Sequence, residues 1–117
     1  MARTSATLAL VLALAACTNT HVVGSRHTVH VGLTEYRLSP QSVRAPAGEL
    51  RIFVRNYGRL THDLVIFRGA RVEGGTPPIM PGSQSFMRVR LSRGTYLMTS
   101  NLFSDQALGL YGTLVVH

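Results

Sequence analysis

Cysteine, histidine and carboxylate side chains are the groups in this sequence that could hold a metal ion or act as an acid, base or nucleophile. The 117 residues include one cysteine, five histidines and five acidic residues. The cysteine is Cys17, so the chain can form no internal disulfide and no zinc or iron–sulfur cluster that needs several thiolates. A metal site in the rest of the chain would have to use histidine, carboxylate or methionine.

Three of the histidines lie in or just after a polar N-terminal stretch: His21, His27 and His30. Histidine is the commonest metal ligand, so these residues could form a loose metal-binding arm. No predicted element would bring them together, however. We favour the interpretation that they belong to a solvated tether and to the first strand.

Serine, histidine and aspartate all occur, but they form no recognisable catalytic set. The sequence contains no nucleophile elbow, and no glycine-rich phosphate loop follows a strand. The sequence therefore predicts a protein that is not an enzyme.

The elements that must position these side chains are short strands. Apolar and polar residues alternate along Glu49–Tyr57 and Ser85–Leu91, which is typical of strands with one buried face. No amphipathic helix is predicted. Six to eight strands in roughly 90 residues favour an all-β fold, an antiparallel Greek-key β-sandwich. The other predicted strands are Val29–Tyr36, Ser42–Ala45, His62–Phe67, Thr95–Ser100 and Gly112–Val116, with loops over 68–84 and after Ser100.

Residues 1–17 have the features of a bacterial export signal. Arg3 supplies a positive charge, and the run from Ala6 to Ala16 is apolar. A helix of that length extends about 16 Å, well short of a bilayer core of ~30 Å, so the run fits a signal peptide better than a membrane span. It ends in Leu14-Ala15-Ala16-Cys17, which resembles a lipobox. That motif implies cleavage before the cysteine and attachment of a diacylglycerol to its thiol.

The lipobox resemblance divides the chain into a signal peptide (1–16), a lipid-anchored tether (17–28) and one folded domain (29–117). Cys17 is then the lipid-attachment residue, and its acyl chains hold an extracytoplasmic protein on a bacterial membrane. The alternative is an ordinary signal peptide in which the cysteine is incidental.

The charge balance is strongly basic, because 12 arginines and five acidic residues give a net charge of +7. Arg51, Arg55, Arg88 and Arg90 fall on the outward faces of their predicted strands. We favour a solvated sheet face; the alternative is a basic patch that lies against anionic lipid headgroups. Nucleic-acid binding is not expected, since the arginines are dispersed and no nucleic-acid-binding motif is present.

Four pieces of the sequence, taken in order, resemble the cupredoxin family, which includes plastocyanin, azurin and auracyanin. They are Asn56–Ile66, which contains His62, then Pro81–Ser85, Arg93–Tyr96 and Gly109–Val116. The resemblance spans Val29 to Val116. It implies a Greek-key sandwich with one copper ion at one end, held by a histidine that matches His62 and by Cys, His and Met from the final loop. A His₂Cys set with a distant Met is the blue-copper arrangement used in electron transfer.

The final loop has the family's length but lacks its ligands. Anchored on Gly94-Thr95-Tyr96 and on Gly109, the Cys position falls on Ser100, the His position on Asp105 and the Met position on Leu110. A serine hydroxyl stays protonated near neutral pH and is a poor ligand for a soft metal. The resemblance thus implies the fold without a type 1 copper site, and no copper cofactor is expected at these positions.

The same alignment predicts that His62 and Asp105 lie close together. They could form a hydrogen bond or salt bridge that joins strand to loop, or a weak Cu(II) or Zn(II) site completed by water. They could equally be ordinary satisfied polar residues. Ser100 and Leu110 would fill the space that copper ligands occupy in the family.

Met80 and Met98 offer a less favoured route to Cu(I) binding, since methionine is a common gap-filler in cores. Tyr96 resembles the tyrosine corner of Greek-key sandwiches. The leading functional hypothesis is a non-enzymatic binding or accessory module at the membrane, with an unidentified protein partner. The alternatives are handling of copper or another metal at a non-blue site that includes His62 and, third, electron transfer.

Overall fold

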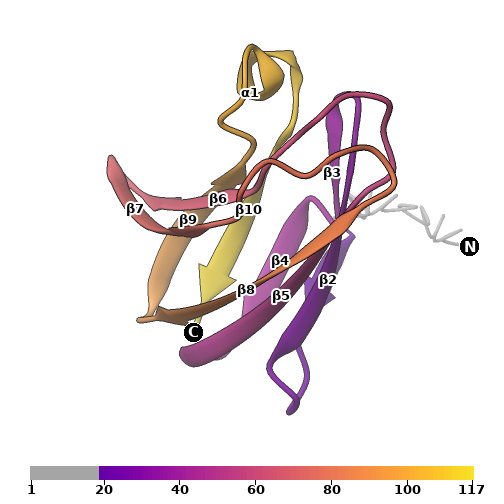
Figure 1. Cartoon of the computed structure of the whole chain (residues 1–117). Helices are drawn as coiled ribbons and strands as arrows, with labels where there is room; N and C mark the ends of the chain where they lie inside the picture. The colour runs from indigo at the N-terminus through magenta and orange to yellow at the C-terminus, as the bar shows by residue number, and fades with distance from the viewer. Residues whose placement is uncertain (1–18) are drawn as a thin grey trace, which may run out of the picture.

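The computed structural model describes residues 19–117, which form ten strands and one short helix (Figure 1). In chain order these are β1 (Thr20–Val22), β2 (Thr28–Thr34), β3 (Arg37–Ser39), β4 (Ser42–Ala45), β5 (Gly48–Asn56), β6 (Val65–Arg68), β7 (Arg71–Gly75), β8 (Gln84–Leu91), β9 (Gly94–Thr99), α1 (Asp105–Leu108) and β10 (Tyr111–Val116). None of the helical structure in this part of the chain is long and apolar enough to cross a membrane.

The strands form two sheets that pack face to face around one core. One sheet has the order β1-β4-β10-β9-β6-β7 and the other the order β3-β2-β5-β8. The predicted all-β sandwich is confirmed. The prediction of purely antiparallel pairing is wrong, because β4 pairs in parallel with both β1 and β10, and β2 pairs in parallel with β5. Between these strands the chain crosses from one sheet to the other, so the partners are not joined as hairpins and need not be antiparallel.

Side-chain alternation along the central strands separates the core from the surface. On β5, Leu50, Ile52 and Val54 are almost fully buried, whereas Arg51 and Phe53 between them are exposed. The period of two therefore identified the buried face correctly. Within residues 19–117, the apolar core draws on both sheets and extends from Val23 to Val116.

The ordered domain begins inside the segment that was predicted to be a tether. Thr20–Val22 form β1, which pairs with β4, and the Val23 amide donates to the Arg44 carbonyl at 2.8 Å. Val23 itself is buried. From Thr20 onward, the segment that was predicted to be a tether therefore pairs with β4 in this structure. These residues show no period because backbone pairing with β4, rather than burial of alternate side chains, orders them.

Three local differences separate the remaining elements from their predicted ranges. His62 lies outside any strand, in an isolated bridge with Ile79, and β6 begins only at Val65. β7 pairs with β6 inside the predicted 68–84 loop, where a Cβ on Gly75 would lie 3.3 Å from the Leu64 carbonyl oxygen. This close approach explains a glycine that looked like a loop residue. The third difference is α1, which occupies part of the predicted final loop.

One end of the sandwich is built from three connections: the β2–β3 turn, the β5–β6 segment and the β9–β10 segment that contains α1. In Figure 1 this end is at the top. It is the end at which the predicted site residues meet.

Candidate functional site

The segment that carries His62 is shaped by the fully buried side chain of Asn56. The Asn56 amide nitrogen donates to the carbonyls of Leu60 and Ile79 at 2.7 and 2.8 Å, and its Oδ1 accepts from the Gly58 amide at 2.8 Å. His62 then exchanges backbone hydrogen bonds with Ile79 at 3.2 and 2.7 Å. These bonds satisfy a non-repetitive segment and hold the imidazole inside the end of the sandwich.

The segment that carries Asp105 is fixed by a single helical turn. The Asp105 amide donates to the Leu102 carbonyl, and the Leu110 amide donates back to the Asp105 carbonyl at 2.9 Å. Gly109 ends the turn in the left-handed region, with φ of 118°, which glycine adopts without strain. The turn directs the Asp105 carboxylate into the protein, where that residue is 4% exposed.

Five polar side chains meet at this end and form what we call the polar cluster: Glu35, His62, Asp63, Ser100 and Asp105. The His62 Nδ1 lies 2.7 Å from Asp105 Oδ2, and its Nε2 lies 3.1 Å from Glu35 Oε1. The Ser100 hydroxyl lies 2.6 Å from Asp105 Oδ2 and 3.0 Å from Asp63 Oδ1. Within residues 19–117, every buried side-chain nitrogen or oxygen has a hydrogen-bond partner.

The imidazole of His62 sits between two carboxylates. Ionised carboxylates only accept hydrogen bonds, so both ring nitrogens must carry protons for both contacts to be hydrogen bonds. The geometry therefore fits the imidazolium form, flanked by Glu35 on one side and Asp105 on the other. His62 is fully buried, which makes these two partners its main source of charge compensation.

Glu35 is held in its ionised form by backbone donors. The Leu60 amide makes the largest contribution, and His62 and the Arg59 amide add to it, lowering the pKa of Glu35 from its ordinary 4.5 to about 2. Both amides lie 2.7 Å from Oε1. Glu35 thus ties the β2–β3 turn to the chain just before His62.

Ser100 links the two aspartates. Its hydroxyl has one proton to donate, and the 2.6 Å contact with Asp105 is shorter than the 3.0 Å contact with Asp63. The hydroxyl oxygen also accepts from the Asp63 amide at 3.3 Å, and the Asn101 amide donates to Asp63 Oδ1 at 2.6 Å. The hydrogen bonds of Ser100 and Asp63 therefore join the end of β9, α1 and the His62 segment.

The structure brings together the residues that the loop spacing aligned. His62, Ser100 and Asp105 touch one another through Asp105 Oδ2. Leu110 is fully buried beside them, and its carbonyl accepts from the Ser100 amide at 3.2 Å. Cys17, the predicted lipid-attachment residue, lies outside the described residues.

Two members of the cluster, Glu35 and Asp63, were not anticipated. Glu35 comes from a turn in the other sheet, 27 positions before His62, and no local pattern marks it. Asp63 had a weak signal, because it follows His62 directly in a chain that has only five acidic residues. Carboxylates are seldom buried without a partner, so an acidic residue next to a histidine in a predicted buried strand indicates a polar site.

Other candidate residues stay apart from the cluster. Met98 is buried in the core, and Met80 is 68% exposed. His30 lies on an outer strand face, where its ring stacks on Phe53. The Tyr96 hydroxyl donates to the Ser92 carbonyl at 2.6 Å, which matches the tyrosine-corner geometry.

The residues at this end do not fit a type 1 copper ion. Ser100 and Leu110 offer no thiolate or thioether, and both nitrogens of His62 already face carboxylate oxygens. Among residues 19–117, no three histidine, cysteine or acidic side chains are arranged so that they could share a metal ion. The arrangement supplies a buried, charged clasp between three chain segments.

No protein-family model and no curated protein matches this sequence. Solved structures do resemble it. Reduced auracyanin from the photosynthetic bacterium Roseiflexus castenholzii has a TM-score of 0.74 at 16% identity, over 80% of this chain and 99% of that one. Auracyanin A, a blue copper protein from Chloroflexus aurantiacus, has a TM-score of 0.69 at 15% identity over 82% and 99% of the two chains.

Rusticyanin from Thiobacillus ferrooxidans has a TM-score of 0.66 at 15% identity, over 85% of this chain and 82% of its own. At such identities the similarity establishes the fold and leaves the chemistry to be argued from the residues present. This protein has the cupredoxin fold.

Proposed function

We propose that this protein is a lipid-anchored, extracytoplasmic binding module that keeps the cupredoxin fold without a type 1 copper site and without enzymatic activity. The observation that carries this proposal is the pair of contacts at His62, whose two ring nitrogens face Asp105 and Glu35. A metal ligand needs a free ring lone pair, and here neither nitrogen offers one.

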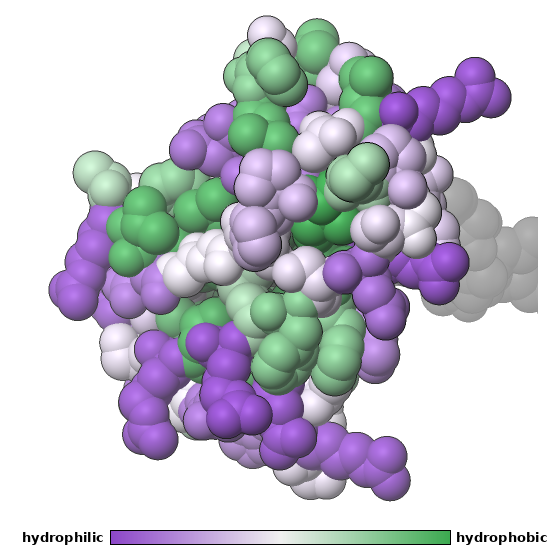
Figure 2. Space-filling model, viewed as in Figure 1, coloured by the Kyte–Doolittle hydropathy of each residue, from purple (hydrophilic) through white to green (hydrophobic). Residues whose placement is uncertain are grey.

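The wider surroundings support a binding role. Large apolar side chains are exposed beside α1, including Phe103 at 98% and Leu108 at 55%. Figure 2 shows apolar surface at this upper end of the molecule. Several large apolar side chains exposed at one end favour an interaction site, which supports the expectation of a protein partner.

Calorimetric titration of the 19–117 segment with Cu(I), Cu(II) and Zn(II) tests the proposal. We expect no tight, stoichiometric binding that depends on His62. The matched control is His30→Ala, because His30 is an exposed histidine outside the polar cluster. Tight binding that disappears in His62→Ala but persists in His30→Ala would instead establish metal handling at this end.

Metal handling is the second candidate, since Asp105 and Glu35 each lie within hydrogen-bond distance of one ring nitrogen of His62. A Cu(II) or Zn(II) ion would have to displace one of the two carboxylates from the ring. Any such site would therefore bind in competition with a proton on His62 and weaken as the pH falls.

Lipid attachment is tested separately in cells. We expect the mature protein to carry a diacylglycerol and to fractionate with membranes, whereas Cys17→Ser should be released or retained uncleaved. Mass spectrometry of the N-terminal peptide reads the modification directly. A mature, unacylated N-terminus other than residue 17 would overturn the anchor.

A further inference from the structure

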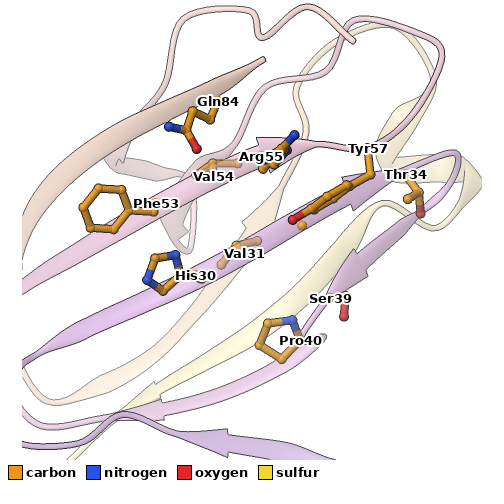
Figure 3. Close-up of a pocket in the computed structure, with 11 residues that line it drawn as sticks. His30, Val31, Thr34, Ser39, Pro40, Phe53, Val54, Arg55, Tyr57 and Gln84 are labelled. Carbon is orange, nitrogen blue, oxygen red and sulfur yellow. The ribbon is translucent and has the colours of Figure 1, made fainter. Parts of the chain in front are cut away.

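The exposed surface of the four-stranded sheet carries a row of rings that runs across three strands. His30 on β2, Phe53 on β5 and Phe86 on β8 are cross-strand neighbours. The ring centroids of His30 and Phe53 are 5.0 Å apart and stacked, and those of Phe53 and Phe86 are 4.8 Å apart. Figure 3 shows His30 and Phe53 side by side on this surface, which we call the outer sheet face.

Arginines border the ring row on the same face. Arg55 holds its guanidinium 5.2 Å from the centre of the Tyr57 ring, and the ring lies over Gly32, where a Cβ would be 3.1 Å from Tyr57. Glu49 is the acidic residue among the outward positions, 3.5 Å from an arginine. The outward arginines of this sheet are Arg37, Arg51, Arg55, Arg88 and Arg90.

Two of these arginines are placed against each other. Arg51 on β5 and Arg88 on β8 are directly opposite in the strand register. Like charges at such positions destabilise a sheet, and Glu49, 3.5 Å from Arg88, compensates only one of the two arginines. An anionic surface against this face would compensate both positive charges, because each guanidinium can donate two hydrogen bonds to one phosphate.

The position of the N-terminal end of the described chain indicates which anionic surface binds the outer sheet face. Asn19 lines a hollow together with Arg37 and Pro40, and Pro40 also lines the hollow on the outer sheet face. Because β1 starts at Thr20, Cys17 precedes the first described residue by only two positions. Two residues of chain span at most about 7 Å, so acyl chains on Cys17 begin close to this edge.

From these observations we infer that the outer sheet face lies against the anionic headgroups of the membrane that anchors the protein. The arginines contact lipid phosphates, and the exposed rings of Phe53, Tyr57 and Phe86 rest at the boundary between headgroups and acyl chains. The upper end with α1 then remains free for a partner. The inference rests on the lipid-anchor part of the proposed function and adds the orientation of the domain.

Co-sedimentation of the 19–117 segment with lipid vesicles tests this inference without the acyl chains. We expect no binding to phosphatidylcholine vesicles, and binding that increases with the fraction of phosphatidylglycerol. Raising the salt from 0.1 M to 1 M should abolish it, because the screening length falls from about 10 Å to 3 Å. The double change Arg51→Gln/Arg88→Gln should lower the partition coefficient roughly 25-fold, at about a factor of five per arginine.

The matched control is Arg71→Gln/Arg93→Gln, which removes the same charge from the other sheet and a turn. Arg71 faces Glu73 at 3.6 Å, much as Arg88 faces Glu49 at 3.5 Å. The control should bind vesicles within about twofold of the parent. Equal losses of vesicle binding in the two double variants, or binding that does not depend on lipid charge, would overturn the inference.

Sedimentation equilibrium on the same samples tests a competing occupant. A dimer that becomes monomeric only in Arg51→Gln/Arg88→Gln would show that the outer sheet face binds a second copy, and would also overturn the inference. Because the segment lacks Cys17, none of these results depends on whether the anchor or the absence of a metal site is correct.

Discussion

The polar cluster and the outer sheet face both depend on charged residues, but they balance charge in opposite ways. In the cluster, His62 and Asp105 are buried and each ring nitrogen of the histidine has a carboxylate partner. On the face, Arg51 and Arg88 are exposed and oppose each other. Charge inside this fold therefore joins chain segments, whereas we propose that the arginines of the outer sheet face bind lipid headgroups. Substitutions should separate the two regions, because cluster variants lose stability and face variants lose binding.

Removing the central carboxylate should have the largest effect. Asp105→Ala leaves the buried Nδ1 of His62 and the Ser100 hydroxyl without their shared acceptor. We expect the free energy of unfolding to fall by about 3–5 kcal/mol, measured by denaturant titration. Gln106→Ala, on the exposed side of the same helical turn, should cost less than about 0.5 kcal/mol. A loss below 1 kcal/mol for Asp105→Ala would contradict the role of the cluster as a clasp.

Replacing both His62 and Asp105 tests whether the two residues act as a pair. In His62→Leu/Asp105→Leu no unpaired ion is left, Glu35 keeps the amides of Arg59 and Leu60, and Ser100 keeps Asp63. The double variant should therefore be more stable than Asp105→Ala by about 1–3 kcal/mol, since apolar replacement of a buried ion pair is often close to neutral. If the double variant is the less stable of the two, the residues do not act as a pair.

Glu35 should give a pH-dependent contribution of intermediate size. Folding lowers its pKa from 4.5 to about 2, so its stabilising effect is complete above pH 4.5 and is lost as the pH falls toward 2. Glu35→Gln should lower the unfolding free energy by about 1–2 kcal/mol at pH 7, and the difference should shrink between pH 4.5 and 2. Glu49→Gln, on the exposed sheet face, should change stability by less than about 0.5 kcal/mol. A Glu35→Gln effect that is constant across this pH range would exclude the ionised form as its cause.

A substitution on the outer sheet face should change the stability least, and it should stabilise the protein rather than destabilise it. Arg51→Gln relieves the cross-strand repulsion with Arg88, so we expect stability to rise by about 0.2–1 kcal/mol. Thermal unfolding at low ionic strength would show this most clearly, because salt screens the repulsion. Arg44→Gln is the control, because Arg44 is an exposed strand arginine that lies opposite Val22 and Val115 in the register. A loss of stability in Arg51→Gln would mean that this face is charged for structural reasons.

Sequence reasoning succeeded where a pattern repeats along the chain. Alternation on Gly48–Asn56 and Gln84–Leu91 reports burial directly, so the buried faces could be predicted. The contact between His62 and Asp105 was predicted from the resemblance to cupredoxins, in which the loop spacing aligns Ser100, Asp105 and Leu110 with ligand positions.

Sequence reasoning failed where a segment is ordered by a partner that lies far away along the chain. β1 has three exposed residues and exists because β4 offers its edge. Glu35 reaches His62 from a turn of the other sheet, and its amide donors belong to Arg59 and Leu60. Such contacts join residues more than 20 positions apart and leave no periodic trace in the sequence.

We propose that His62, Ser100 and Asp105 of the polar cluster occupy, together with Leu110, the positions that match the copper ligands of cupredoxins. The most direct measurement is the visible spectrum, with Cu(II) added, of the triple variant Ser100→Cys/Asp105→His/Leu110→Met, with His62 unchanged. Our account predicts stoichiometric copper binding and an intense visible band from copper–thiolate bonding, absent in the parent chain. A folded triple variant that binds copper without that band would show that these four positions do not converge as a metal site.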